Sequence, residues 1–297
     1  MTEFTAENLS SALAKLISGA GQSVVSVHSH KSRASGFVWR PGLIVTADEA
    51  LADEGEIMVA TAGGTAVSAK LAGRDPTTDV ALLRVETADL LPASFSSAVP
   101  AAGHLVVAVG ARDGAVVAAH GIVSHAGAAW RSMRGGDIDQ RIELDLRLSH
   151  MAEGGVAVDH SGKVLGMAVL GPRRRALVIP AATIERVAAR LLSHGRIARG
   201  YLGLGLQPVH VVGAKDGGVM VISVDSSGPG ATAGFHQGDI LTGWNGEPIK
   251  HMGTLLRALG PDSVGTTITL DMLRAGESRQ MSLVVGERPS ISKEDGH

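Results

Sequence analysis

The pattern of hydrophobic and polar positions changes once, early in the chain, from a helical period to a strand-like one. Apolar Leu9, Leu13, Leu16 and Ile17 recur at helical spacing behind Thr5, a suitable N-cap, and glycines then break the pattern. From residue 23 onward, short β-branched runs alternate with Gly and Pro. We therefore predict a helical arm over residues 1–22, followed by strands near 23–28, 36–39, 43–46, 57–60, 80–85, 105–109, 121–124, 141–144, 156–158 and 164–169.

Breaks in this pattern divide the chain into domains. A break at residues 96–101, which include two serines and a proline, divides the strand-rich region into roughly equal halves, so that paired β-barrels are conceivable. Residues 181–194 follow Pro180 with an apolar face and predict a helix that closes this domain. Further strands, a Gly/Pro turn and another helix follow in a smaller region. The predicted boundaries are 23–195 for the first domain, 200–288 for the second and 289–297 for a polar tail.

Composition supports a mostly β protein with two cores. The 297 residues are 44% hydrophobic and include 39 glycines, but only 3% are aromatic, so Val, Ala, Leu and Ile must fill the interior. A formal charge of -2 gives no general field that would attract nucleic acid or an anionic membrane. The absence of cysteine excludes disulfides and thiol catalysis.

No targeting segment is visible in the sequence. Residues 1–22 lack a basic stretch followed by a continuous apolar run, and no run approaches the roughly 20 apolar residues of a membrane-spanning helix. We therefore expect no membrane partner. Because the sequence starts at Met1 without a signal, we expect a cytoplasmic protein, or a periplasmic one if a leader has been removed.

Four segments of the first domain match the motifs of one protease family. Residues 45–51 read Val-Thr-Ala-Asp-Glu-Ala-Leu, 75–83 read Asp-Pro-Thr-Thr-Asp-Val-Ala-Leu-Leu, 142–155 end in Met-Ala-Glu-Gly-Gly, and 159–166 form a glycine-turn hairpin. Their order resembles that of the HtrA/Deg family, trypsin-like serine proteases followed by a PDZ domain. The resemblance covers about residues 23–288. It implies a mostly β fold, with a chymotrypsin-like double β-barrel, an α+β PDZ domain and a short N-terminal helical arm.

The resemblance places Glu49 at the catalytic histidine, Asp79 at the triad aspartate and Glu153 at the nucleophilic serine. In the triad mechanism a neutral imidazole takes the proton of the serine hydroxyl, and the aspartate orients that imidazole. Glu49 cannot replace the oriented imidazole, and Glu153 has no hydroxyl to donate. Met151 also replaces a glycine whose backbone freedom helps to form the oxyanion hole. We therefore expect an inactive member of the family, a pseudoprotease.

Two interpretations of the substituted positions remain open. Glu49 and Glu153 are either products of drift in an idle cleft, or part of a new site at which three close carboxylates raise a pKa, bind a cation or find basic partners. Arg173, Arg174 and Arg175 lie in the loop that walls the primary specificity pocket in the family, so one of them is a candidate to reach Glu153 and plug the cleft. No ligand spacing supports a metal centre, and we predict neither metal nor cofactor.

The second domain carries the most specific motifs of the chain. Residues 199–206 resemble the carboxylate-binding loop and following strand of HtrA-type PDZ domains, and 218–224, 227–235 and 238–246 continue that pattern. In such domains loop amides bind a terminal carboxylate, and the peptide adds as a strand at the sheet edge. Some helix positions are alternatively core residues. The predicted peptide-binding residues are Tyr201, Leu202, Gly203, Leu204, Leu206, Met252, Leu255 and Leu256.

Together these motifs predict an HtrA-like pseudoprotease that binds hydrophobic C-termini or unfolded segments through its PDZ domain. It would act as an adaptor, chaperone or regulator in protein quality control. The alternative is a serine-type endopeptidase, or a metal-dependent hydrolase with a rebuilt carboxylate site. Family members commonly form trimers through the N-terminal part of the protease domain. The resemblance thus also implies a homotrimer, or a mixed oligomer with an active relative, in which residues 1–22 take part.

Overall fold

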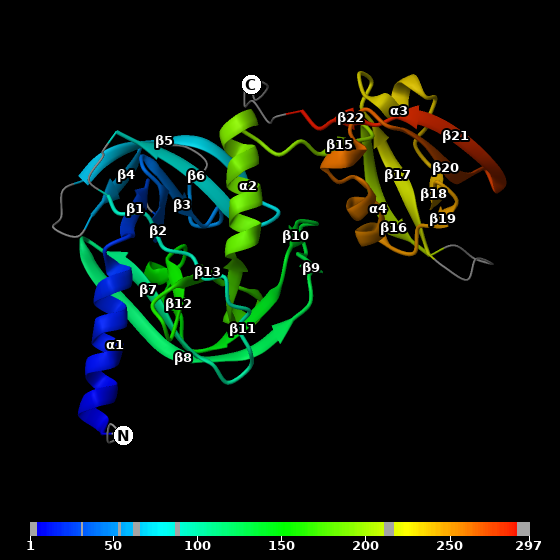
Figure 1. The fold of residues 1–297 in the computed structure, drawn as a ribbon. Coiled ribbons are helices and arrows are strands. Elements are labelled where there is room, and N and C mark those ends of the chain that lie inside the picture. Colours follow the sequence, from blue (N-terminus) through cyan, green and yellow to red (C-terminus); the bar gives the residue numbers. More distant parts are fainter. Residues whose placement is uncertain are drawn as a thin grey trace. The chain divides into compact units, whose positions relative to one another are not determined.

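The computed structural model describes residues 5–30, 32–52, 55–61, 66–86, 90–210 and 217–289. It divides into two compact units, Met1–Ile197 and Ala198–His297 (Figure 1). The first unit holds two closed β-barrels, and the second holds a separate sheet with short helices. The predicted mostly β fold, with a double barrel, a PDZ domain and an N-terminal helix, is confirmed.

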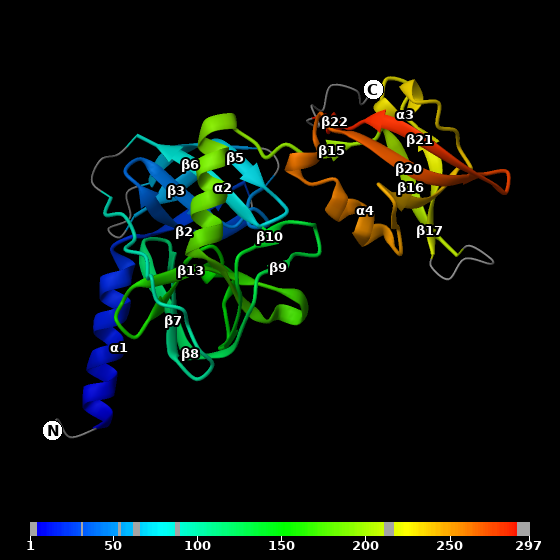
Figure 2. The ribbon, with the colours of Figure 1, turned by 45° about the vertical axis from the view of Figure 1, so that its right-hand side comes forward.

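The predicted arm is a helix, α1 (Ala6–Gly21), which extends from the first unit in both ribbon views (Figures 1 and 2). Thr5 caps it, because its Oγ1 accepts a hydrogen bond of 3.2 Å from the Asn8 amide. Leu13, Leu16 and Ile17 pack against the core of the first unit. Leu9, one turn earlier, remains 41% exposed. The C-terminal half of the helix is thus anchored, while its first turns face solvent; residues 1–4 of the predicted arm lie outside the described residues.

The first barrel closes in the order β1-β2-β3-β6-β5-β4. Its interior is aliphatic: Val25, Val27, Val38, Ile44 and Leu83 are almost fully buried. One strand, β5, was not among those predicted, because its buried positions are interrupted by exposed polar ones. The strands are β1 (Val24–Ser29), β2 (Ser32–Arg40), β3 (Leu43–Thr46), β4 (Ile57–Ala60), β5 (Ala66–Asp75) and β6 (Val80–Val85).

The second barrel closes in the order β11-β14-β13-β12-β7-β8, and a small ribbon, β9 with β10, leaves it between β8 and β11. Helix α2 (Ala181–His194) contacts strands of both barrels and ends at Gly195 in the left-handed conformation, as predicted. The strands are β7 (Leu105–Arg112), β8 (Ala115–Gly127), β9 (Trp130–Arg131), β10 (Asp137–Ile138), β11 (Arg141–Asp145), β12 (Val156–Asp159), β13 (Val164–Leu170) and β14 (Ala176–Pro180); short 3-10 turns are η1 (His150–Ala152) and η2 (Pro172–Arg174).

The second unit is built on a sheet with the path β16-β17-β18-β20-β21, in which β16 forms an edge. Phe235, Leu241, Ile249 and Leu270 fill its core. The strands are β15 (Gly200–Tyr201), β16 (Leu204–Val209), β17 (Gly218–Val224), β18 (Ile240–Trp244), β19 (Glu247–Pro248), β20 (Thr267–Arg274), β21 (Glu277–Val284) and β22 (Gly286–Glu287), and the helices are α3 (Pro229–Thr232), α4 (Met252–Ala258) and the 3-10 turn η3 (Pro261–Ser263).

Candidate functional site

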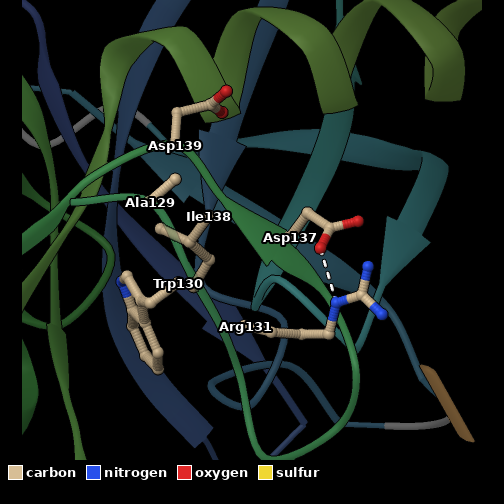
Figure 3. A pocket seen from close by; sticks show the side chains of 6 residues that line it. All are labelled: Ala129, Trp130, Arg131, Asp137, Ile138 and Asp139. Carbon is tan, nitrogen blue, oxygen red and sulfur yellow. Dashed lines mark hydrogen bonds and ion pairs between the residues drawn. The ribbon is translucent and has the colours of Figure 1, made fainter.

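A cavity of about 300 Å³ lies at the β9–β10 ribbon, and none of the predicted site residues line it (Figure 3). Its charged side chains are paired within the protein, whereas the buried indole Nε1 of Trp130, which also lines the cavity, has no hydrogen-bond partner among the described residues. Arg131 pairs with Asp137 at 2.6 Å, and Asp139 accepts hydrogen bonds from Thr183 and Arg186. Burial raises the pKa of Asp139, but these bonds outweigh it and hold the pKa below its usual range. The cavity therefore indicates no reactive group.

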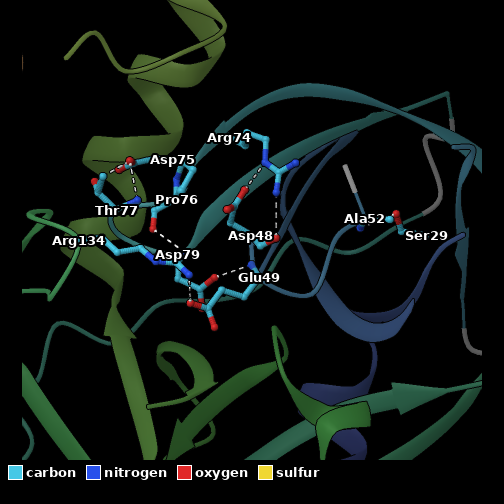
Figure 4. Close-up of polar contacts among 10 residues, drawn as sticks. All are labelled: Ser29, Asp48, Glu49, Ala52, Arg74, Asp75, Pro76, Thr77, Asp79 and Arg134. Carbon is cyan, nitrogen blue, oxygen red and sulfur yellow. Dashed lines mark hydrogen bonds and ion pairs between the residues drawn. The ribbon is translucent and has the colours of Figure 1, made fainter. Parts of the chain in front are cut away.

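The three triad positions come from three loops of the first unit. Glu49 follows β3, Asp79 precedes β6, and Glu153 follows the η1 turn ahead of β12. The amide of Glu49 donates a hydrogen bond of 2.8 Å to Oδ1 of Asp79 (Figure 4). Behind Glu49, the buried Asp48 pairs with Arg74. The main chain thus holds the histidine position against the aspartate position, as a triad requires.

The pKa of the Asp79 carboxyl is raised well above that of an ordinary aspartate. Burial raises its pKa from 3.8 to about 7, the hydrogen bond from the Glu49 amide opposes that rise, and the negative charges of Glu49, Glu153 and Asp48 add to it. The negative charges of Glu49 and Glu153, which were expected to lie near Asp79, therefore contribute to raising its pKa. Asp79 also has a φ of 59°, in the left-handed region that Asp tolerates better than most residues.

Glu49 has a partner that sequence reasoning missed. Its Oε1 lies 2.9 Å from Nη2 of Arg134, in the turn between β9 and β10 (Figure 4). Both side chains are about half exposed, at 48% and 53%. No motif marks Arg134, because only the folding of the ribbon back onto the first barrel brings it to Glu49.

Glu153 is a buried, hydrogen-bonded carboxylate, with 9% of the residue exposed. Its Oε1 accepts a hydrogen bond of 3.2 Å from the Leu170 amide, and its Oε2 lies 3.4 Å from Nδ1 of His150. Its carbonyl oxygen accepts a 2.8 Å hydrogen bond from the Ser35 amide in the first barrel. The side chain at the serine position therefore serves local structure.

The arginine run behaves differently from the expectation. Arg174 Nη1 lies 2.9 Å from Nε2 of His150, so it connects to Glu153 only through that ring, and Arg175 pairs with Glu143 at 3.2 Å. Within the described part of the chain, Arg173, Arg174 and Arg175 make no direct ion pair with Glu153. Of the two roles that the sequence left open for this loop, a direct contact of an arginine with Glu153 is therefore not made among the described residues, because the imidazole of His150 lies between Arg174 and Glu153.

In the segment that would supply an oxyanion hole, backbone amides are hydrogen-bonded to acceptors of the same segment. In the turn at His150–Ala152, the Glu153 amide donates to the His150 carbonyl at 3.2 Å, and the Met151 amide donates to Ser149 Oγ at 3.3 Å. Met151 is not among the described residues with positive φ. An oxyanion hole needs N–H groups that point at the substrate. Here these donors are engaged within the turn.

The two glycines after Glu153 are required by close packing. Gly154 has a φ of 83°, and a Cβ there would lie 2.3 Å from the Ser35 carbonyl oxygen. A Cβ on Gly155 would lie 2.3 Å from the Val109 carbonyl oxygen. The backbone after Glu153 thus fits tightly between the two barrels.

In the second unit, hydrogen bonds fix the predicted carboxylate-binding loop. Tyr201 donates to Asp225 at 2.8 Å, the Leu202 carbonyl accepts from the Gly230 amide at 2.7 Å, and the Gly203 carbonyl accepts from the Asp225 amide at 2.8 Å. Gly203 has a φ of 69°, and a Cβ on it would lie 2.8 Å from the Gly228 Cα. The loop ends at the edge strand β16.

Burial separates the predicted peptide-binding residues into two groups. Leu202 and Leu255 belong to the core of the unit, at 3% and 0% exposure, so the expectation that they line a groove is corrected. Gly203 is buried as well, and the remaining five keep exposed surface: Tyr201, Leu204, Leu206 and Met252 are partly exposed, and Leu256 is 46% exposed. These residues belong to the loop, to β16 and to α4.

Two further features limit the chemistry of the described residues. None of their His, Asp or Glu side chains form a group of three or more that would hold a metal ion. Among the helices in the described ranges, none has both the length and the apolar character needed to cross a membrane.

Comparisons with known proteins agree with this arrangement. A trypsin-like peptidase domain model matches residues 34–167, and a PDZ domain model matches residues 200–285. A probable periplasmic serine endoprotease DegP-like from Rhizobium meliloti is 32% identical over 282 residues, and a protein of the same name from Bartonella henselae is 33% identical over 269 residues. The matched regions cover 89% and 85% of this chain but only 55% and 52% of the two relatives, so the chain spans about half their length.

Solved structures show the same likeness. A serine endoprotease from Yersinia pestis superposes with a TM-score of 0.72 at 25% identity, covering 97% of this chain and all of the other. The HtrA-type protease AlgW, solved with a decapeptide, gives a TM-score of 0.71 at 21% identity over 93% of this chain and 99% of that one, which shows likeness of fold alone. From the two domain models, the DegP-like relatives and the shared fold, the chain belongs to the HtrA/Deg family, with a trypsin-like peptidase domain followed by a PDZ domain.

Proposed function

We propose that this chain is an HtrA/Deg member that does not cleave peptides and instead binds polypeptide through its PDZ domain. Its ligands are hydrophobic C-termini or unfolded segments, and its role is that of an adaptor, chaperone or regulator in protein quality control. The observation that carries the proposal is the buried, hydrogen-bonded Glu153 at the serine position, beside a turn whose amides are already engaged.

The cleft lacks the groups that acyl transfer needs. Glu153 has no hydroxyl, and attack on a peptide by a carboxylate would form an anhydride instead of an ester. Glu49 pairs with Arg134, and its carboxylate cannot replace the imidazole that a triad aspartate orients. Asp79 is held in place, but it has no imidazole to act on. Loss of triad members leaves only a residual rate from binding and the oxyanion hole.

The second unit keeps the features that peptide binding needs. β16 is an edge strand, so a peptide can add beside it through main-chain hydrogen bonds. Leu204 and Leu206 on β16, with Met252 and Leu256 on α4, offer apolar surface to a hydrophobic terminus. The structural relative AlgW has been solved with a decapeptide and with a tripeptide, which supports peptide binding here.

The first test is a cleavage assay with an unfolded, fluorescently labelled substrate and an active relative as positive control. We expect no turnover by the native chain. A Glu49→His, Met151→Gly, Glu153→Ser variant tests whether the scaffold still supports chemistry. Turnover by the native chain that survives repurification and is lost in Asp79→Ala would overturn the proposal and favour a rebuilt carboxylate site.

The second test measures peptide binding by fluorescence anisotropy. A labelled peptide with a hydrophobic C-terminal residue is compared with its C-terminal amide, which lacks the carboxylate. We expect binding of the free acid, weakened at least tenfold by Leu204→Glu, because a charge enters the apolar surface beside β16. Val284→Glu is the matched control, since Val284 is 56% exposed on β21 at the other end of the sheet path. Equal binding of acid and amide would contradict the proposed carboxylate recognition.

The cytoplasmic location expected from the sequence gains no support from the comparisons, because the DegP-like relatives are named as periplasmic. We propose the periplasm for this chain as well. Fractionation of cells that express the protein at its natural level tests this, and recovery with cytoplasmic markers would overturn it.

A further inference from the structure

The turn between β9 and β10, residues 132–136, lies on the loops that carry the first two triad positions; we call it the strap. Arg134 pairs with Glu49 and also reaches the Pro76 carbonyl at 3.4 Å (Figure 4). Ser132 Oγ donates to the Thr77 carbonyl at 2.5 Å. The strap leaves the second barrel and these partners belong to the first, so the contacts join the barrels beside the cleft.

Hydrogen bonds within the strap fix its backbone conformation. The Ser132 amide donates to the Gly136 carbonyl at 2.8 Å, and the Gly135 amide donates to the Ser132 carbonyl at 3.0 Å. Gly136 is packed so closely that a Cβ would lie 2.3 Å from the Thr77 carbonyl oxygen. These bonds restrict the conformations of the turn that carries Arg134 to Glu49.

We propose that the Arg134–Glu49 ion pair is a latch that holds the strap closed over the histidine position. The carboxylate at this position then has a role of its own, because it supplies the anion that Arg134 needs. Arg134, 2.9 Å from Glu49, in turn offsets the negative charge that Glu49 adds beside Asp79. A histidine at position 49 would be neutral or positively charged, so it could not form the ion pair with Arg134 that serves as the latch.

The exposure of both partners makes the latch easy to open. Ion pairs of this kind contribute up to about 1 kcal/mol, which corresponds to roughly fivefold in the closed-to-open ratio, and salt screens them. The strap is therefore biased toward closure and remains able to open. This inference stands whether or not the chain cleaves peptides, since it concerns only the position of the strap.

Hydrogen–deuterium exchange of the full chain tests the latch. We expect Arg134→Gln and Glu49→Gln each to increase exchange of the amides at 132–136 and 77–79 by about two- to fivefold. The double variant should exceed neither single one, because the two changes remove the same pair. The charge swap Glu49→Arg with Arg134→Glu should restore slow exchange.

The matched control is Arg131→Gln, which breaks the Arg131–Asp137 pair within the ribbon itself. It should leave exchange at 77–79 unchanged. The latch is overturned if the effects of Arg134→Gln and Glu49→Gln are additive, if the charge swap fails to restore protection, or if Arg131→Gln exposes 77–79 to the same extent. Raising NaCl to about 1 M should open the native strap and leave Arg134→Gln unaffected; the same response in both would also contradict the latch.

Discussion

Asp79, the residue that we propose stands at the triad aspartate position, lies in contact with the main chain of Glu49 and has no imidazole as a hydrogen-bond partner among the described residues. It accepts the Glu49 amide, lies among other carboxylates and holds a pKa near 7. In an active triad the aspartate is ionised beside an imidazole that becomes positive. Here burial, together with the negative charges of Glu49, Glu153 and Asp48, raises the pKa of Asp79 to about 7.

The raised pKa of Asp79 makes stability depend on pH. The folded chain holds the carboxyl proton up to about pH 7, whereas the unfolded chain releases it near 3.8. Between these values the folded state binds more protons, so the free energy of unfolding falls as pH rises and then levels off. We expect Asp79→Asn to lack this fall and, at pH 8, to exceed the native chain by up to about 4 kcal/mol, at 1.36 kcal/mol per pKa unit.

Urea unfolding at pH 4 to 8 measures this difference. Asp139→Asn is an informative control, because the pKa of Asp139 is lowered and its contribution has the opposite sign. Asp139→Asn should lose stability at neutral pH, with the loss shrinking as the solution is acidified. Parallel stability curves for the native chain and Asp79→Asn would show that Asp79 does not hold its proton.

The structural role of Glu153 gives a second prediction. Glu153→Ala leaves the partly buried Leu170 amide without its charged acceptor and should cost about 1–3 kcal/mol in the free energy of unfolding. Glu153→Gln keeps an oxygen acceptor and should cost less. Equal, near-zero costs for both variants in urea unfolding would mean that Glu153 is a passive remnant of drift.

At the scale of elements, the loop ahead of β16 depends on a glycine. Gly203→Ala places a Cβ against Gly228 and also imposes a left-handed conformation on alanine, whereas Gly246→Ala has the same kind of positive φ with nothing within 4 Å. Gly246→Ala should cost about 1–2 kcal/mol. Gly203→Ala should cost more and weaken peptide binding at least tenfold, because the carboxylate loop must shift.

Thermal unfolding and fluorescence anisotropy of the two glycine variants separate strain from loop geometry. If both variants bind peptide like the native chain, the loop at 200–206 is not where the peptide carboxylate binds.

Most elements with regular patterns were predicted from the sequence, although the fully buried strand β14 was not, and elements made by tertiary contacts were not predictable. The α1 helix follows from its cap and apolar stripe, and α2 follows from Pro180 and Gly195. β5 was not predicted, because consecutive exposed positions interrupt its alternation of buried and exposed residues. The motifs located Glu49, Asp79 and Glu153, but Arg134 has no neighbour in sequence that predicts its contact with Glu49.

At the scale of the whole molecule, the exposed first turns of α1 are a candidate assembly surface. Leu9 presents an apolar side chain there, while later positions of the helix are anchored in the core. If the chain forms a homotrimer or joins an active relative through this arm, Leu9→Glu should shift the assembly toward monomer. Ser11→Glu, at another exposed position of the same helix, should not.

Light scattering after size-exclusion chromatography gives the molar mass of each variant. A native monomer, or an oligomer that Leu9→Glu leaves intact, would show that α1 has no part in assembly.

The turn at His150–Ala152, with its internal hydrogen bonds, and the carboxylate of Glu153 after it have a consequence for the detection of this protein by chemical labelling in a cell. Fluorophosphonate reagents, which reveal serine hydrolases by forming a bond to the reactive oxygen, find no hydroxyl at position 153. A survey with these reagents would register active relatives and pass over this chain. If its PDZ domain binds polypeptide ends as proposed, an unseen competitor would share their substrates.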